Sequence, residues 1–162
     1  MAGGESDDAL VRGALQTPCG PLGITVQGGR LVSLEWFPEP PVLPGRSPAL
    51  VRIADQIRAY FRDPGVRFRC RLDLSASLFC LRVWGALLTI PPGQTRTYGQ
   101  LARQLDASPR AVAAACRANP CPIVIPCHRV VAQDGLGGYG GGRSPALLAV
   151  KRCLLRHEGW HG

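Results

Sequence analysis

A chain of 162 residues, 46% of them hydrophobic, is long enough to bury a core as one domain or two small ones. No apolar run could span a bilayer, and the small, acidic residues 1–8 do not resemble a secretory signal, which predicts a cytoplasmic protein. The net charge of +8 is uneven, because residues 75–162 carry ten basic side chains and three acidic ones. The positive charge of this half favours a polyanionic partner, most simply nucleic acid. The alternative is that the charge serves solubility alone.

The seven cysteines are odd in number and include no CxxC pair. In a chain without a signal, this pattern indicates free thiols in a reducing compartment. Zinc ligation by Cys121, Cys127 and His128 is the weaker reading, because their spacing matches no common zinc pattern. We therefore expect no metal and no cofactor.

The first half reads as a scaffold that follows a disordered tail over residues 1–10. Alternating runs over residues 14–17, 22–26 and 31–36, separated by Pro- and Gly-containing turns, predict an antiparallel meander. Residues 38–48 hold five prolines and predict a loop. Helical spacing over residues 49–61 predicts a helix, and the alternation over residues 68–74 predicts one more strand.

The second half is mostly helical by pattern. Residues 75–90 predict a well-buried helix marked by Trp84, Val83 and several leucines, including Leu78, Leu81 and Leu88. Two short helices follow, over residues 97–105 and from Pro109 to Arg117, with Ser108 as the cap of the second. Two short helices joined by a tight turn are similar to a helix-turn-helix, which favours DNA binding when the surroundings are basic.

The stretch from Ile125 to Val131 places a thiol, Cys127, beside an imidazole, His128. Pro126 lacks an amide donor, so a regular central strand should not pass through it. We expect a buried strand that bends at Pro126 and points Cys127 into a pocket.

A stretch with six glycines, residues 135–142, permits close approach of the backbone to a ligand, although a flexible surface loop has the same composition. The spacing is not that of a P-loop. A last helix is predicted from Pro145 to His157 and ends at Glu158 and Gly159. A carboxylate is electrostatically unfavourable at a helix C-terminus, so Glu158 suggests a partner such as an imidazolium, with a solvated charge as the common alternative.

These segments resemble one known family in order and spacing. Arg110-Ala111-Val112, Asn119-Pro120, residues 125–130 (IPCHRV), Gly138-Tyr139 and the segment Leu154-Leu155-x-x-Glu158-Gly159 are similar to the O6-alkylguanine-DNA alkyltransferases, also called methylated-DNA–protein-cysteine methyltransferases. The resemblance is dense over residues 75–159. It implies an α+β fold, in which a small N-terminal α/β domain of ribonuclease H-like layout (11–74) precedes a mostly helical, winged-helix-like alkyltransferase domain with a helix-turn-helix (75–162).

The resemblance also implies roles. Cys127 would accept the alkyl group of O6-alkylguanine, or of O4-alkylthymine, in a single turnover after base flipping. His128, oriented by Glu158, would draw the thiol proton through a water, and Asn119 would brace the turn before the reactive cysteine. The residues expected to contact the base or the DNA are Tyr98 over the extruded guanine, Arg110 in the gap left in the duplex, Val130 and Arg129 beside the reactive cysteine, and Tyr139 and Gly140 on the O6 side.

The chemistry fits the resemblance, since attack on an alkyl carbon requires a soft nucleophile and thiolate is the best that a protein has. Double-stranded DNA is the expected partner, the protein is expected to act as a monomer, and cooperative binding along DNA is left open. One alternative is a cysteine hydrolase, which would turn over repeatedly. The other is a non-enzymatic, lesion-binding DNA module in which Cys127 is a structural thiol.

Overall fold

The computed structural model describes residues 9–39, 47–140 and 142–162, which form an α+β protein. The chain divides into two compact units between Leu74 and Ser75, and each is described by itself. Residues 1–8 of the expected tail (1–10) and most of the proline-rich loop (38–48) lie outside the described residues. Among those described, no helix is both long and apolar enough to cross a membrane.

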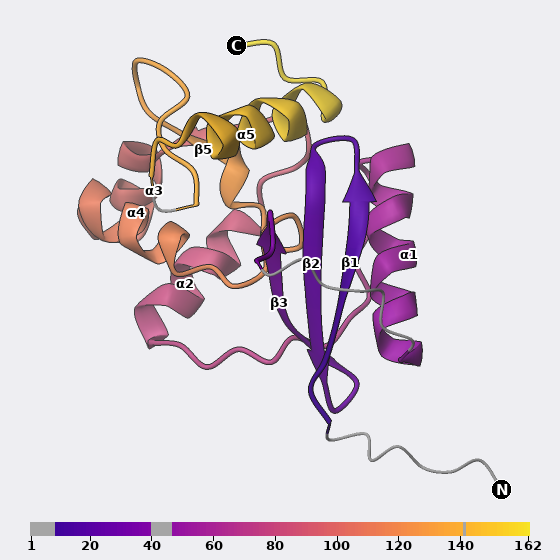
Figure 1. The fold of residues 1–162 in the computed structure, drawn as a ribbon. Coiled ribbons are helices and arrows are strands. Elements are labelled where there is room, and N and C mark those ends of the chain that lie inside the picture. The colour runs from indigo at the N-terminus through magenta and orange to yellow at the C-terminus, as the bar shows by residue number, and fades with distance from the viewer. Residues whose placement is uncertain (1–8, 40–46, 141) are drawn as a thin grey trace, which may run out of the picture. The chain divides into compact units, whose positions relative to one another are not determined.

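The first unit contains a three-stranded antiparallel meander with strand order β1-β2-β3, as the alternating runs predict (Figure 1). Its strands are β1 (Val11–Thr17), β2 (Gly20–Gln27) and β3 (Arg30–Trp36). Gly28 and Gly29 join β2 to β3 with φ of 57° and 72°, which glycine adopts without the steric cost of a Cβ. The alternating apolar side chains of β2, Leu22, Ile24 and Val26, are buried.

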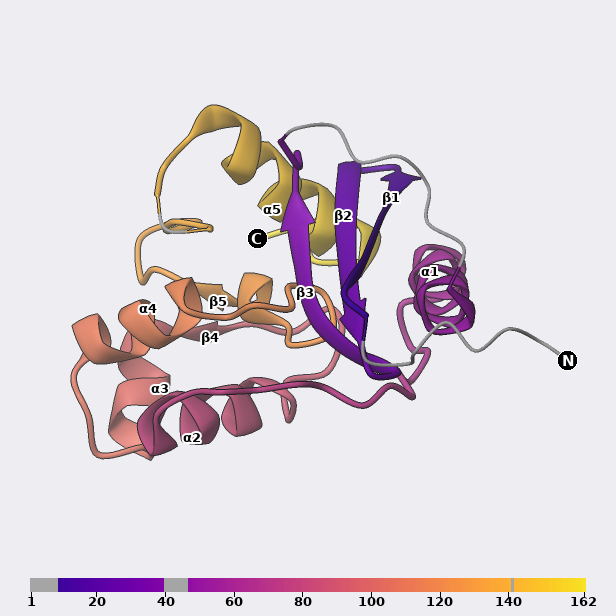
Figure 2. The same ribbon diagram turned by 60° about the horizontal axis from the view of Figure 1, so that its bottom comes forward.

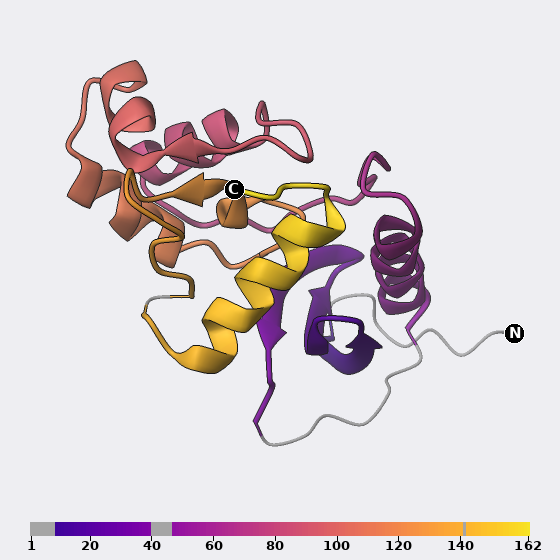
Figure 3. The ribbon, with the colours of Figure 1, turned by 90° about the horizontal axis from the view of Figure 1, so that it is seen from above.

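Helix α1 (Pro48–Arg62) packs against this sheet (Figure 3). Ser47 caps it by accepting a hydrogen bond from the amide of Leu50, and its buried face includes Ile53 and Ile57. The strand expected over residues 68–74 is reduced to a single bridge between Leu31 and Leu72, so that prediction is wrong in extent. The amide of Leu31 donates to Arg71 O, and its carbonyl accepts from the amide of Asp73.

The second unit holds four helices among its described residues, together with a two-stranded parallel pair (Figure 2). The helices are α2 (Leu78–Leu87), α3 (Tyr98–Gln104), α4 (Pro109–Arg117) and α5 (Pro145–His157). Strands β4 (Arg96–Thr97) and β5 (Val130–Val131) pair in parallel and bring the start of α3 close to the residues that follow Cys127. A short 3-10 helix, η1 (Cys127–Arg129), packs on α5 and α2.

Helix α2 buries a different face from the one that its leucines suggest. Val83, Trp84 and Leu87 are buried, but Leu78 and Leu88 are 82% and 58% exposed, so the prediction of a helix buried through all of its leucines is wrong. Leucines 78, 81 and 88 lie at helical spacing and form a second apolar row. Because α2 is apolar on most of its circumference, periodicity alone does not select the row that faces the core.

Helices α3 and α4 pack on each other and are joined by a tight turn at residues 105–108. Thr97 and Gln100 form a capping box at the start of α3. Ser108 caps α4 by accepting from the amide of Ala111, with Pro109 in the first turn, as predicted. The indole of Trp84 donates to Ala115 O at 2.8 Å, which fixes α4 on the buried face of α2.

Candidate active site

The backbone that presents Cys127 is a turn and not a strand. Pro126 has φ of −81° and ψ of 64°, and the amide of Cys127 donates to Ile125 O at 2.8 Å, which is an inverse γ-turn. Before it, Ile125 N bonds Cys121 O at 2.9 Å, and Ile123 has φ of 72°. The expected bent strand before Pro126 is therefore wrong, because these local turn bonds use the groups that a sheet would need.

Asn119 holds this turn from the end of α4. Its side-chain amide donates to Ile125 O at 2.8 Å, and its side-chain oxygen accepts from the amide of Cys121 at 2.9 Å. The same side chain helps to lower the pKa of Cys127 by hydrogen bonding. Asn119 thus lies where the family resemblance expects a bracing residue.

A buried cluster joins His128, Arg129 and Glu158. His128 Nε2 lies 2.9 Å from Glu158 Oε2. Arg129 donates through Nε to Oε1 and through a terminal nitrogen to Oε2, both at 2.8 Å, and through its other terminal nitrogen to Ile90 O at 2.6 Å. The carboxylate at the C-terminus of α5 therefore has two partners. Arg129, grouped by sequence with the residues that contact DNA, instead directs its guanidinium inward.

The cluster determines the protonation of the imidazole. Burial lowers the pKa of His128 below its usual 6.5, although Glu158 acts in the opposite direction, so the ring is neutral at neutral pH. Since the carboxylate can only accept, Nε2 must carry the proton that it donates to Glu158. Nδ1 is then an acceptor, and among the described residues it has no hydrogen-bond partner. His128 is thus arranged as a base.

Burial raises the pKa of the Cys127 thiol, whereas Asn119 and then Lys151 act to lower it. The thiol therefore needs a base to become a nucleophile at neutral pH, because only the thiolate reacts. His128, the next residue in the same short helix, can supply that base. Among the described residues, no group of three His, Cys, Asp or Glu side chains is arranged to hold a metal ion.

Lys151 is a site residue that no sequence motif indicated. It is the single lysine of the chain, it is fully buried on α5, and its ammonium donates to Val130 O and Leu136 O at 2.7 Å and to Gly138 O at 2.8 Å. Burial lowers its pKa to about 8. A lysine within the apolar row that contains Leu154 and Leu155 was the available signal, because a buried lysine requires acceptors.

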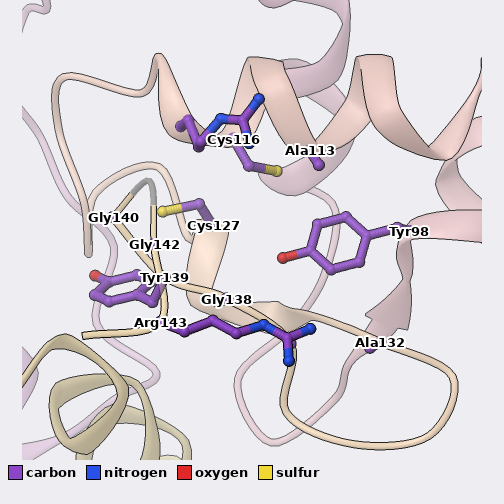
Figure 4. Close-up of a pocket in the computed structure, with 12 residues that line it drawn as sticks. Tyr98, Ala113, Cys116, Cys127, Ala132, Gly138, Tyr139, Gly140, Gly142 and Arg143 are labelled. Atoms are coloured by element: carbon purple, nitrogen blue, oxygen red, sulfur yellow. The ribbon is translucent and has the colours of Figure 1, made fainter. Parts of the chain in front are cut away.

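A cavity of about 330 Å³ opens beside Cys127 (Figure 4). We call it the Cys127 pocket; its walls come from α3, α4, Cys127, Ala132 and the glycine-rich segment, through Tyr98, Ala113, Cys116, Arg117, Gly137, Gly138, Tyr139, Gly140, Gly142 and Arg143. The Tyr98 hydroxyl points into it. Burial, followed by the nearby thiols Cys116 and Cys127, raises the pKa of Tyr98 to about 12, so this hydroxyl remains a hydrogen-bond donor.

Some of the other predicted residues line this pocket, and the rest lie outside it. Tyr139 is buried, and Gly140 has φ of 61°, where a Cβ would lie 2.9 Å from a methyl carbon of Leu147. Val130, which directly follows η1, is buried. Arg110 does not line the pocket and is exposed in the first turn of α4.

The free thiols among the described cysteines are Cys70, Cys80, Cys116, Cys121 and Cys127. Cys116, which sequence reasoning treated as incidental, lines the Cys127 pocket, and burial raises its pKa to about 12. Cys116 is therefore a protonated wall residue, while Cys127 is the thiol with a base beside it.

A buried thiol, a buried His–Glu pair and a pocket lined in part by two short helices make up the candidate site. The family described as "6-O-methylguanine DNA methyltransferase, DNA binding domain" matches residues 78–160. Methylated-DNA–protein-cysteine methyltransferase of Mycobacterium tuberculosis is 39% identical over 155 residues, which cover 85% of this chain and 90% of that protein. The same-named protein of Archaeoglobus fulgidus is 37% identical over 137 residues, covering 84% and 90%.

Solved structures of proteins with this activity in their names have a similar fold. A crystal structure of the M. tuberculosis O6-methylguanine methyltransferase has a TM-score of 0.77 at 38% identity and covers 93% of both chains. A crystal structure of M. tuberculosis OGT in complex with DNA has a TM-score of 0.76 at 39% identity, with 91% of both chains covered. The chain therefore belongs to the methylated-DNA–protein-cysteine methyltransferase family.

Proposed function

We propose that this protein repairs O6-alkylguanine in double-stranded DNA by moving the alkyl group to Cys127. The observation that carries the proposal is a buried thiol that opens on a pocket and is followed by a histidine held by Glu158. A guanine must leave the stacked duplex before its O6 substituent can reach such a recessed sulfur, which requires base flipping.

The transfer is a single displacement. His128 Nδ1 takes the Cys127 proton, through a water as in the family, and Sγ then attacks the alkyl carbon. The S–C bond forms as the C–O6 bond breaks, and the electron pair stays on the guanine. Tyr98 can donate a hydrogen bond to the leaving base and disperse this charge, as an oxyanion hole does. The departing guanine anion takes up one proton, which balances the one that the Cys127 thiol gave to His128, so the products are guanine, neutral His128 and a thioether on Cys127. Because a thioether is inert, each molecule acts once.

The surrounding elements support DNA as the substrate. The helix pair α3–α4 has helix-turn-helix form, and Arg110 stands exposed in the first turn of α4. In our proposal this pair enters the minor groove, and Arg110 fills the space left by the extruded base. The second unit is the alkyltransferase domain, of winged-helix-like type, and the first is a scaffold of ribonuclease H-like layout. We place the protein in the bacterial cytoplasm, with chromosomal DNA as its substrate.

Arg129 receives a different role from the one that the sequence suggested. Its guanidinium is committed to Glu158 and Ile90 O, so we propose that it fixes the carboxylate that orients His128. A residue that holds the carboxylate in this way keeps His128 in the orientation that the reaction needs, and it does not itself contact the substrate.

The decisive experiment measures intact-protein mass after incubation with excess duplex DNA that carries one O6-methylguanine. We expect a gain of one methyl group, mapped to Cys127 by peptide analysis and absent from Cys127→Ser. Loss of the lesion without protein alkylation would indicate a turnover enzyme such as a hydrolase. An untouched lesion with normal binding of lesion-bearing DNA would favour the non-enzymatic alternative.

The rate of methyl transfer should also depend on pH through His128. Because burial lowers the His128 pKa below 6.5, the ring keeps its acceptor nitrogen at neutral pH and loses it only in more acidic solution. We expect a flat rate near pH 7 and an acid limb below pH 6.5. Single-turnover rates between pH 5 and 8 test this, and His128→Asn should be slow and should lack the limb. Circular dichroism at each pH separates this effect from acid unfolding, since a histidine buried as the neutral form also costs stability below pH 6.5.

A further inference from the structure

Arg143 is a wall residue of the Cys127 pocket to which no role has been given. It follows the glycine-rich segment and precedes α5, and Figure 4 shows its side chain extended along the pocket, with the guanidinium directed toward the side of Tyr98 and Ala132. The positive charge of Arg143 acts to lower the pKa of Tyr98, against the larger effect of burial, so the two side chains are close enough to interact electrostatically. An arginine therefore borders the space that the proposed function assigns to an extruded base.

The guanidinium of Arg143 has no described protein partner. It forms no ion pair or hydrogen bond with the described residues (9–39, 47–140 and 142–162). Arg117 lines the same pocket from the last turn of α4, and it forms none with these residues either. Arg129 and Lys151, by contrast, each donate three hydrogen bonds to acceptors of the protein. Two arginines with free donors at one pocket suggest an anionic ligand at its mouth.

The base itself does not supply that anion. An O6-alkylguanine is neutral, but the nucleotide that carries it is linked through a phosphodiester on each side. When the nucleotide swings out of the stack, these two phosphates follow its sugar toward the pocket rim. Arginine presents donors in a planar fork that fits phosphate oxygens in two parallel hydrogen bonds.

We propose that Arg143 binds a phosphate that flanks the extruded nucleotide and so holds the alkyl carbon against Cys127. This inference rests on the proposed function and names a positioning residue that the sequence motifs did not include. Arg117 occupies the α4 side of the pocket and can take the phosphate on the other side of the same nucleotide. A contact of this kind favours the flipped state, because the phosphate comes within reach of Arg143 only after extrusion.

The test is a cycle that combines a protein change with a DNA change. Arg143→Gln should slow single-turnover methyl transfer from duplex DNA by about tenfold or more, as expected for a lost hydrogen bond between charged groups. A neutral methylphosphonate at one linkage beside the O6-methylguanine should slow the wild type by a similar factor. At that linkage, Arg143→Gln should lose little more, because both changes remove the same contact.

Three further measurements separate a phosphate contact from an altered pocket. Arg143→Lys should recover part of the rate, since it keeps the charge but not the fork. The salt dependence of DNA binding should become shallower by about one in the log–log slope for Arg143→Gln. The loss with duplex DNA should be several times greater than the loss with the free base O6-methylguanine, which has no phosphate. Arg62→Gln, an exposed arginine of α1, removes equal charge and serves as the control.

Additive losses from Arg143→Gln and from methylphosphonates at both flanking linkages would overturn the proposal. So would an equal loss with the free base, which would assign Arg143 to the shape of the pocket. Failure of the proposed function gives a different result, because the wild type would then gain no methyl group from any of these substrates.

Discussion

Replacing Glu158 by glutamine should slow methyl transfer by about 10²- to 10⁴-fold, the range associated with loss of general-base catalysis. Glutamine has the shape of glutamate, but its amide nitrogen donates. If that nitrogen faces His128 Nε2, then Nε2 must accept, the ring proton moves to Nδ1 and the base is lost. If it faces Arg129 instead, His128 keeps its proton on Nε2 but loses the carboxylate charge that raises its pKa, so it is a weaker base for the Cys127 proton. Single-turnover transfer from O6-methylguanine DNA measures the effect.

The same change should destabilise the protein by about 3–5 kcal/mol, because it leaves the buried Arg129 guanidinium without a counter-charge. At about 2–4 °C per kcal/mol for a chain of this size, the melting temperature should fall by roughly 6–20 °C. The matched control is Glu35→Gln, which breaks an exposed pair with Arg12 and should shift stability by less than about 1 kcal/mol. Similar melting temperatures and rates for the two variants would show that the buried cluster has no special role.

Replacing Lys151 by methionine should be the second most damaging change. Methionine fills a similar volume but leaves the carbonyls of Val130, Leu136 and Gly138 without their shared donor. Because an unsatisfied buried acceptor costs about 1–3 kcal/mol, we expect a loss on the order of 3 kcal/mol even if some carbonyls find water. Thermal unfolding followed by circular dichroism measures this loss.

Methyl transfer by Lys151→Met should slow as well, for two reasons. The carbonyls of Leu136 and Gly138 anchor the glycine-rich wall of the Cys127 pocket, and the lysine charge helps to lower the pKa of Cys127. Arg152→Met, at the exposed neighbouring position of α5, removes the same charge without removing these bonds. If Arg152→Met and Lys151→Met lost equal rate and stability, net charge and not the carbonyl contacts would be responsible.

The sequence by itself predicted the elements whose signals are local. Gly28-Gly29 places a tight turn between two alternating runs, and Ser108-Pro109 starts α4 where a cap and a first-turn proline require it. It also identified Cys127 and His128 as neighbours and singled out Glu158 as a carboxylate in need of a partner. Each signal is carried by residues a few positions apart, so no distant contact was needed to interpret it.

Only the tertiary structure decided which partners several side chains contact. Arg129 could have faced DNA, but Glu158, 29 residues away in the chain, holds it inward. The apolar run before Pro126 forms a turn because Asn119 and local backbone bonds satisfy its polar groups, and α2 buries one of two apolar rows because α4 packs on that side. Lys151 finds its acceptors in segments 13 to 21 residues away. A local pattern states which groups a segment offers, but the partners of buried groups are set by contacts between segments, which form only when the chain has folded.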